Sequence, residues 1–338
     1  MPGRMAVTIH DVAGLARVSQ ATAARALGGY GYVSAKARAR VEAAARTLGY
    51  VPNSVARALA SGVSGVIGLV VGDIENPFFA AAARGLSDIV EARGYTVLLA
   101  NSDEDESRER AAVAALRARQ VDGLVVTPHA SSASPHLQAA LAATPVVLLD
   151  RTVRGLAVDA VTVDNVAGAR AATEHLLAHG HRRIGIVTDE PVIASSAERL
   201  RGYRAALEAA GVPVTRELIS VGGSSRAEGY RAAQALLQLE PRPTALFSSN
   251  NFMTVGTMHA LRDAGLRLPH DVSLVGFDDL EWTTLIDPPL TVVAQPAGEL
   301  GSEAGRRILA RLDGATGRPK RVRLETELIL RGSVAAPA

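Results

Sequence analysis

The sequence has no cysteine among its 338 residues, which excludes disulfides and metal sites built from thiolates. Aromatic residues make up only 4 % of the chain, although hydrophobic residues reach 48 %. The cores must therefore be built from Ala, Val and Leu. No apolar run approaches the ~20 residues that a membrane-spanning helix needs, and the first residues lack the apolar region of a signal peptide. We therefore expect a cytoplasmic protein without a membrane partner.

Charge is divided unevenly along the chain. Residues 1–62 contain eight Lys or Arg and two acidic residues, a net charge of +6, whereas residues 63–338 contain 28 basic and 32 acidic residues, a net charge of −4. A chain of this length suits two or three domains. A basic head on an acidic body is typical of a nucleic-acid-binding domain attached to another domain.

Residues 8–29 predict two short helices joined by a tight turn. Thr8 and Ser19 are favourable N-caps, and apolar residues follow at helical spacing: Ile9, Val12, Ala13 and Ala16 in the first helix, Ala23, Ala26 and Leu27 in the second. The outer face of the second helix then carries Gln20, Ala21, Ala24 and Arg25. Small residues let a helix enter the major groove, where Gln can pair with adenine and Arg with guanine. An ordinary helix corner has the same spacing.

Two further segments complete the head. Ser34 can cap a third helix that ends at Gly49, with Ala37, Val41, Ala44 and Leu48 on one face. Residues 53–62 are Ala-rich but span only about two helical turns, which is too short for a stable isolated helix. Leu59 in this segment has no core of its own. We expect the segment to be disordered unless something holds it.

From Val66 onward, apolar strands alternate with amphipathic helices, which predicts parallel sheets in an α/β domain. Strands are expected at 66–71, 96–100, 123–127 and 146–150, and in a second series at 184–187, 218–221, 245–249, 273–277 and 291–295. Helices of the second series are expected near 166–179, 197–210, 226–238 and 252–264. A last helix at 296–312 and a last strand at 321–330 should cross between two doubly wound lobes.

Polar side chains stand where these strands end. They are Asp73, Asn76, Asp150, Asn250, Asp278 and Gln295, and Arg199 begins a helix after another strand. Ligands of open α/β sheets bind beyond the carboxyl ends of the strands, so the pattern predicts a polar cleft between the lobes. Each of these residues is also an ordinary turn residue.

Two clusters offer other chemistry. His175, His179 and His181 could approach a metal ion, but cationic side chains also favour the carboxyl end of a helix, which would stop at Gly180. We expect no metal there. The acidic run 103–107 is interpreted as a solvated helix start, because Asp and Glu favour the first turn.

The sequence resembles the LacI/GalR (lactose-repressor/galactose-repressor) family of bacterial transcription regulators. The resemblance covers nearly the whole chain and rests on TIHDVAGLARVSQATAARAL, VSAKARARVEAAARTLGYVPNSVARALASG, NPFF, VDGLVV, AERLRGY, SNNFMTVG, LVGFDD and PPLTVVAQP. It implies an all-α helix-turn-helix headpiece (1–52), a hinge helix (53–62) and an α/β periplasmic-binding-protein-like domain (65–338) of two doubly wound parallel-sheet lobes. This last domain would bind effector and dimerise, with a first lobe at 65–164 and 296–322 and a second at 165–293 and 323–333.

The resemblance also implies roles for individual residues. The DNA-binding positions would be Thr8, Ser19, Gln20, Ala21, Thr22, Arg25, Asn53 and Leu59, the last as a minor-groove wedge. The effector-binding positions would be Asn76, Phe78, Phe79, Asp150, Arg199, Ser224, Asn250, Asp278 and Gln295. Three positions depart from the usual pattern. Arg17 replaces a turn Gly and should be forced to positive φ, Ser224 replaces a frequent aromatic residue, and Asn251 replaces Asp.

The predicted function is a ligand-responsive, sequence-specific DNA-binding regulator, a repressor rather than an enzyme. One short helix contacts few base pairs, so a homodimer on a palindromic operator is expected. The effector should be a sugar or sugar-like molecule, with a purine or an amino acid as alternatives, and no cofactor is expected. The last residues show no heptad repeat, so we do not expect a tetramer held by a coiled coil. The competing functions are a solute-binding protein and a two-lobed α/β enzyme, for which no nucleotide-binding glycine motif is found.

Overall fold

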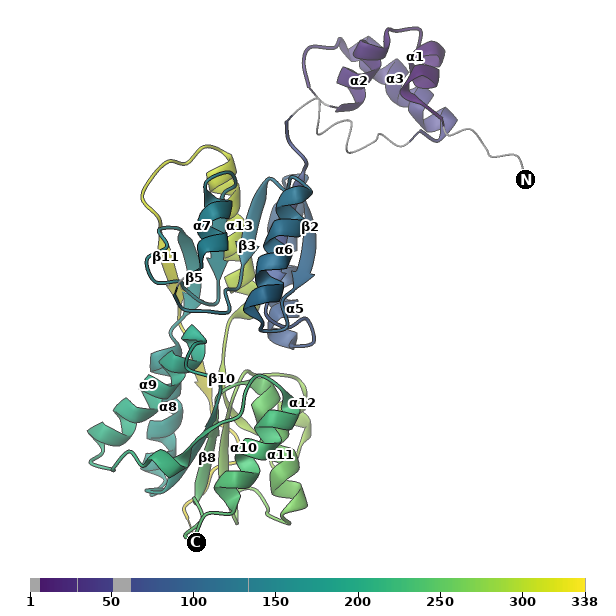
Figure 1. The fold of residues 1–338 in the computed structure, drawn as a ribbon. Helices are drawn as coiled ribbons and strands as arrows, with labels where there is room; N and C mark the ends of the chain where they lie inside the picture. The colour runs from purple at the N-terminus through teal and green to yellow at the C-terminus, as the bar shows by residue number, and fades with distance from the viewer. Residues whose placement is uncertain (1–6, 29, 51–61, 133, 338) are drawn as a thin grey trace. The chain divides into compact units, whose positions relative to one another are not determined.

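The computed structural model describes residues 7–28, 30–50, 62–132 and 134–337 (Figure 1). The predicted hinge, including Asn53 and Leu59, lies outside the described residues except for Gly62. The chain divides into two compact units, residues 1–66 with 120–122 and the remainder. No helix in the described ranges is both long enough and apolar enough to cross a membrane.

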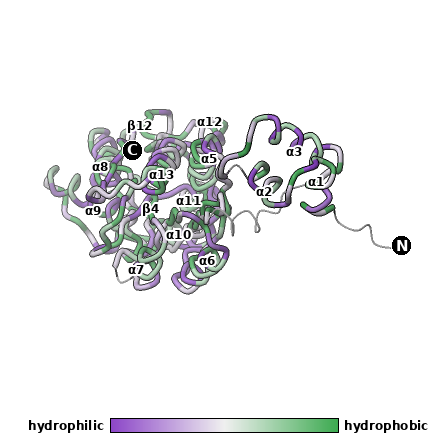
Figure 2. Tube along the Cα trace, turned by 90° about the horizontal axis from the view of Figure 1, so that it is seen from above, coloured by the Kyte–Doolittle hydropathy of each residue, from purple (hydrophilic) through white to green (hydrophobic). Residues whose placement is uncertain are grey.

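The described part of the head contains three helices, α1 (Ile9–Ala16), α2 (Gln20–Gly28) and α3 (Ala35–Leu48). Their inner faces form a core of small residues: Val12, Ala13, Ala16, Ala23, Ala26, Val41, Ala44 and Ala45. Hydrophobic and hydrophilic residues alternate along these helices in Figure 2, as expected for helices that bury one face. The predicted helices and their inner faces are confirmed.

The turn between α1 and α2 has a strained residue. Arg17 lies in the left-handed region with φ 52° and ψ 53°, as the sequence predicts, and this conformation costs a non-glycine residue roughly 1 kcal/mol. The Ser34 hydroxyl accepts a hydrogen bond from the Ala37 N–H at the start of α3, and Gly49 ends that helix with φ 65°. Local capping chemistry therefore sets the limits of α3.

The first lobe of the body is a six-stranded sheet in the order β11-β5-β4-β3-β1-β2. Its strands are β1 (Val66–Val71), β2 (Thr96–Asn101), β3 (Gly123–Val126), β4 (Val146–Leu149), β5 (Asp159–Val163) and β11 (Arg321–Leu324). Helices α5 (Pro77–Glu91) and α13 (Ala297–Leu312) pack together on one face, and α6 (Glu106–Ala118) and α7 (Pro135–Leu141) cover the other (Figure 1).

The second lobe repeats this design with the strand order β12-β10-β9-β8-β6-β7. Its strands are β6 (Ile184–Thr188), β7 (Ile219–Val221), β8 (Ala245–Ser248), β9 (Ser273–Phe277), β10 (Thr291–Ala294) and β12 (Glu327–Ile329). Helix α8 (Asn165–Ala178) pairs with α9 (Ala194–Ala209), and α10 (Arg226–Leu237) pairs with α11 (Asn251–Asp263); a short 3-10 helix (Arg216–Leu218) and α12 (Trp282–Leu285) complete the lobe. The predicted two-lobed α/β fold is confirmed.

The structure corrects the strand prediction in two places. Strand β5 was not expected, because Asp159 and Thr162 interrupt its apolar run. The single strand expected at 321–330 is two strands: β11 runs parallel to β5 in the first sheet, and β12 runs antiparallel to β10 in the second. Neither strand contains a buried residue, so the sequence pattern alone does not show where the chain changes sheets.

Candidate functional site

Four of the eight predicted DNA-binding residues, Gln20, Ala21, Thr22 and Arg25, lie on α2. Gln20, Ala21 and Arg25 are exposed there. Ser19 caps the helix, because its hydroxyl accepts a hydrogen bond from the Thr22 N–H at 3.1 Å. The Ser19 and Thr22 hydroxyls also lie 2.9 Å apart, so these two side chains hold the start of the helix.

Other contacts restrict the side chains of this surface. Gln20 Nε2 lies 3.0 Å from His10 Nδ1, a partner that sequence reasoning missed, and Arg25 Nε donates to the Ala21 carbonyl at 3.1 Å. The Thr8 hydroxyl donates to Asp11 at 2.7 Å. Hydrogen bonds from the backbone and side chain of Thr8 lower the pKa of Asp11. Thr8 thus anchors the first turn of α1 rather than presenting a free hydroxyl.

In the body, a small cavity of about 40 Å³ lies where strand ends of both lobes meet. It is lined by Asn76, Phe78, Phe79, Asp150, Arg151, Asp189, Ser195, Ser196, Arg199, Asn250, Asp278 and Gln295. Eight of the nine predicted effector positions are in this lining. The ninth, Ser224, lies outside it and donates a hydrogen bond to Asp189 at 2.9 Å. Sequence reasoning missed four lining residues: Arg151, Asp189, Ser195 and Ser196.

Asp278 organises the second-lobe side of the cavity. One carboxylate oxygen accepts hydrogen bonds from the Asn251 backbone N–H at 3.1 Å and from the Asn251 side chain at 3.3 Å. The other accepts from Gln295 Nε2 at 2.5 Å. Gln295 Oε1 is consequently left buried without a hydrogen-bond partner among the described residues, although such an atom normally has one.

A hydrogen bond joins the two lobes beside the cavity. Asn251 Nδ2, at the start of α11, donates to Asn76 Oδ1 at 2.7 Å. The same Asn76 oxygen accepts from the Phe78 N–H at 3.0 Å and so caps α5. The amide of Asn251 therefore connects Asp278 in the second lobe to the helix cap of the first.

Asp150 supplies a second acceptor without a partner. The residue is buried and left-handed, with φ 66°, and its Oδ1 atom has no hydrogen-bond partner among the described residues. The other oxygen lies 3.2 Å from Arg151 Nε. Burial raises the pKa of the Asp150 carboxyl, although the charges of Arg151 and Arg199 oppose the shift.

Arg151 is itself held by Glu104 through two hydrogen bonds of 2.6 and 2.7 Å. The interpretation of residues 103–107 as a wholly solvated helix start is therefore wrong at Glu104, whose side chain is only 11 % exposed. Asp105 does cap α6, as a helix start requires. The acidic run holds one structural ion-pair partner and one cap.

Arg199 lies under the cavity with its guanidinium fixed on three sides. Nε donates to Asn165 Oδ1 at 2.8 Å, a terminal nitrogen donates to the Ser249 carbonyl at 2.6 Å, and the group stacks 3.8 Å from the centre of the Phe277 ring. Burial lowers the pKa of Arg199, while Asp278 and Asp150 favour its charged form. A positioned cation thus faces two buried carboxylates.

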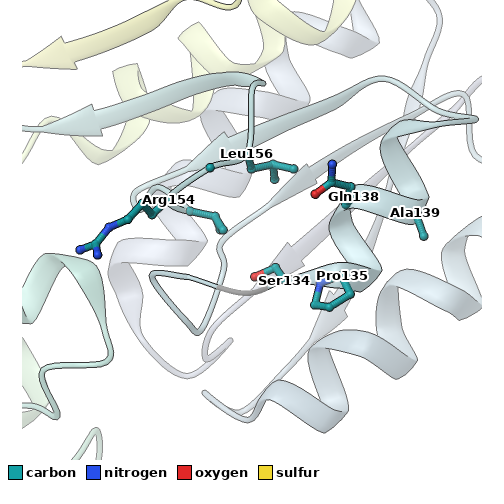
Figure 3. Close-up of a pocket in the computed structure, with 8 residues that line it drawn as sticks. Ser134, Pro135, Gln138, Ala139, Arg154 and Leu156 are labelled. Carbon is teal, nitrogen blue, oxygen red and sulfur yellow. The ribbon is translucent and has the colours of Figure 1, made fainter.

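A larger cavity, about 520 Å³, lies on the first lobe between the start of α7 and residues 153–156 (Figure 3). Ser134, Gln138 and Arg154 are its polar lining residues, and the Arg154 guanidinium extends away from Gln138 in Figure 3. No carboxylate is among the eight residues that line it. The convergence of polar groups, rather than size, therefore marks the inter-lobe cavity as the candidate site.

The three histidines have separate surroundings. His181 is buried, and its ring nitrogens lie 2.9 Å from the Thr244 hydroxyl and 3.0 Å from the Ser273 hydroxyl. The rings of His175 and His179 meet edge to face, with their centres 4.5 Å apart. Helix α8 ends at Ala178, and Gly180 follows with φ 95°. The interpretation of this stretch as a helix end is confirmed.

Comparisons with known proteins cover both parts of the chain. Residues 8–53 match the family model of bacterial regulatory proteins of the lacI family, and residues 64–331 match that of periplasmic binding proteins and the sugar binding domain of the LacI family. The ribose operon repressor of Halalkalibacterium halodurans is 35 % identical, over 96 % of each chain.

Two solved structures are similar over almost the full length. The transcriptional regulator CelR in complex with cellobiose is 33 % identical, with a TM-score of 0.74 over 97 % of this chain and 99 % of that one. The lac repressor dimer bound to operator and the anti-inducer ONPF is 28 % identical, with a TM-score of 0.85 over 98 % of this chain and 100 % of that one.

Proposed function

Because the chain belongs to the LacI family of bacterial transcription regulators, we propose that it represses transcription as a homodimer on a palindromic operator and responds to a sugar. The similar proteins are repressors and regulators rather than enzymes. One of them is a dimer bound to operator, which supports the proposed assembly.

The DNA-binding part of the proposal assigns residues 1–52 to the headpiece, 53–62 to the hinge and 65–338 to effector binding and dimerisation. Gln20, Ala21 and Arg25 would contact bases, since they are exposed on α2. Ser19, Thr22 and Thr8 would position the helices, because their hydroxyls are engaged in capping contacts. Asn53 and Leu59 remain proposed DNA contacts of the hinge.

The proposal of a sugar effector rests on one observation. Two buried acceptors of cavity-lining residues, Asp150 Oδ1 and Gln295 Oε1, have no hydrogen-bond partner in the described part of the chain. A buried acceptor without a partner is costly, and the hydroxyl groups of a sugar could donate to both. Arg199 adds a donor, and Phe78 and Phe79 add aromatic surface for the apolar face of a ring. Ser224 would act indirectly through Asp189.

We take ribose as the first candidate. The cavity of about 40 Å³ is close to the volume of a single water molecule in the liquid, ~30 Å³, so even a pentose requires the lining side chains to rearrange. A small sugar needs the least movement. The similar ribose operon repressor supports the same class of ligand.

Closure of the lobes around the sugar would change the spacing of the two hinge segments in the dimer and thereby the affinity for operator. A ligand shifts such an equilibrium only by its differential affinity for the two states. A coupling free energy of roughly 1–3 kcal/mol is typical.

The test is Asp150→Asn, assayed by calorimetry with ribose, cellobiose and adenosine and by operator binding without ligand. Asn tolerates the left-handed conformation but replaces one carboxylate oxygen with a donor. We expect at least a tenfold loss of ribose affinity, about 1.4 kcal/mol, with ligand-free operator binding unchanged. Asp103→Asn is the matched control, since Asp103 is also left-handed, with φ 50°, and does not line the cavity. Full ribose affinity in the Asp150 variant would refute the site.

A further inference from the structure

The loop between α13 and β11, together with the first residue of β11, presents a group of basic residues that the proposed function does not use. Arg318, Lys320 and Arg321 lie within four residues of one another and are all exposed. None of their side chains has an acidic partner among the described residues. We call these three residues the basic loop.

Hydrogen bonds with Arg311 and Asp159 fix the backbone of this segment. Arg311 forms a two-armed ion pair with buried Asp159, at 2.7 and 2.9 Å, and also donates to the carbonyls of Ala315 and Gly317 at 2.9 and 2.8 Å. Asp159 in turn accepts from the Lys320 N–H at 2.6 Å. Burial would raise the pKa of Asp159, but these hydrogen bonds lower it. The loop therefore presents its cations from a fixed backbone.

The position of the basic loop is set by sheet topology. Strands β11, β5, β4, β3 and β1 pair in parallel, so their amino ends lie at one end of the first lobe. The loop leads into β11 at this end, and the chain coming from the head enters β1 there (Figure 1).

The charge at this end differs from that of the body. The segments that precede β2, β3, β4, β5 and β11 (91–95, 117–122, 142–145, 155–159 and 311–321) hold seven basic and four acidic residues, a net charge of +3. Residues 63–338 as a whole carry −4. Two of the four acids, Asp159 and Asp313, already pair with Arg311 and Arg93. After these two ion pairs are set aside, the five segments still carry a net positive charge.

Favourable contacts with the end of α13 do not account for the basic loop. Cations stabilise the carboxyl end of a helix, but the effect fades beyond the last turn. Helix α13 ends at Leu312, so Arg318 is six residues beyond it and Lys320 and Arg321 are further still. The last turn of α13 therefore does not explain why these three exposed cations are grouped here.

We propose that Arg318, Lys320 and Arg321 bind phosphates of duplex DNA that flanks the operator. The inference rests on the proposed operator binding and adds a second, sequence-independent DNA contact on the body itself. Phosphate contacts of this kind raise affinity without base preference. In a homodimer the two basic loops would extend the footprint on both sides.

The test uses the full-length protein and an operator selected by it from random duplex DNA, prepared as the core site alone and with 15 base pairs added on each side. The variant is Arg318→Gln with Lys320→Gln and Arg321→Gln. We expect a loss of roughly tenfold in affinity on the long duplex at low salt, and a salt slope lowered by about 0.9 for each phosphate contact removed. Affinity for the short duplex should not change.

The matched control removes three exposed cations of the second lobe, with Arg204→Gln, Arg216→Gln and Arg231→Gln, and should leave both duplexes bound as in wild type. Equal affinity of the basic-loop variant and this control for the long duplex would overturn the proposal, as would an equal loss on both duplexes. Failure of the wild type to select any operator would instead refute the proposed function. Both triple variants are first checked for unchanged thermal unfolding. The single variant Arg318→Gln is measured in the same DNA-binding assays.

Discussion

At the scale of the residue, the buried pair of Glu104 and Arg151 shows how a neighbouring charge keeps a buried carboxylate ionised. Burial alone would raise the pKa of Glu104, but the charge and hydrogen bonds of Arg151 lower it to about 2. Arg151 also contacts Asp150 in the inter-lobe cavity. Sequence reasoning predicted Asp150 from its place after a strand, yet missed Arg151, which follows directly, because only the fold reveals its partner 47 positions earlier.

Replacing Glu104 with Gln should destabilise the body by about 3 kcal/mol, because buried Arg151 then loses its two-bond partner and keeps only the contact with Asp150. The free energy of unfolding in urea measures this loss. The control is Glu106→Gln, which removes an exposed i,i+4 pair with Arg110 and should cost less than about 1 kcal/mol. Similar losses in the two variants would show that the buried pair contributes no more than the exposed one.

The lowered pKa of Glu104 also predicts how the stability of the protein changes in acid. The pKa of this carboxyl in the folded protein, about 2, is below the ordinary value of 4.5, so its contribution to stability is complete above pH 4.5 and is lost as the pH falls from there towards 2. Urea unfolding at several pH values should therefore show a steeper loss of stability in this range for wild type than for Glu104→Gln. Parallel curves would contradict the assigned pKa.

At the scale of the element, the strands that are continuously apolar, such as β1 and β9, were predictable because both of their faces are buried. Strand β5 was not, since its polar residues serve tertiary contacts such as the Asp159–Arg311 pair. The packing of α5 on α13 could not be predicted from the sequence either. A side chain on Gly301 would overlap the Ala82 carbonyl, and one on Gly85 would overlap that of Gly298. A helical sequence does not show which of its glycines has such a neighbour.

We therefore expect Gly301→Ala to destabilise the body by about 1–3 kcal/mol through overpacking, even though Ala favours an α-helix by roughly 0.5–1 kcal/mol. Gly298→Ala in the same helix is the control, because its nearest neighbour would be the Ala81 carbonyl at 3.9 Å. That variant should be neutral or slightly stabilising. Urea unfolding of both variants decides the matter, and a stabilised Gly301 variant would mean that the helices separate without cost.

At the scale of the whole molecule, the sequence predicted the cleft because the strand ends of a parallel sheet converge by geometry. It did not predict which groups meet across the lobes. Asn251, noted only as a departure from the family pattern, donates to Asn76 in the opposite lobe, and Ser195 and Ser196 line the cavity from the first turn of α9, three and four residues before Arg199. These contacts depend on the orientation of two lobes that are far apart in sequence.

The hydrogen bond between Asn251 and Asn76 should favour the closed arrangement of the lobes, and with it effector binding. Asn251 is not among the residues that line the cavity, and its backbone N–H bond to Asp278 survives in Asn251→Ser. A hydrogen bond contributes about 0.5–1.5 kcal/mol, so the variant should bind ribose about 2- to 10-fold more weakly by calorimetry. Saturating ribose should still produce the full change in operator affinity, since the ligand can still drive closure.

The control is Glu75→Gln, which removes the exposed inter-lobe pair with Arg226 at 3.6 Å and should change ribose affinity less than about twofold. If Asn251→Ser bound ribose as wild type does, the bond would be equally present with the lobes open or closed, and it could not belong to the switch.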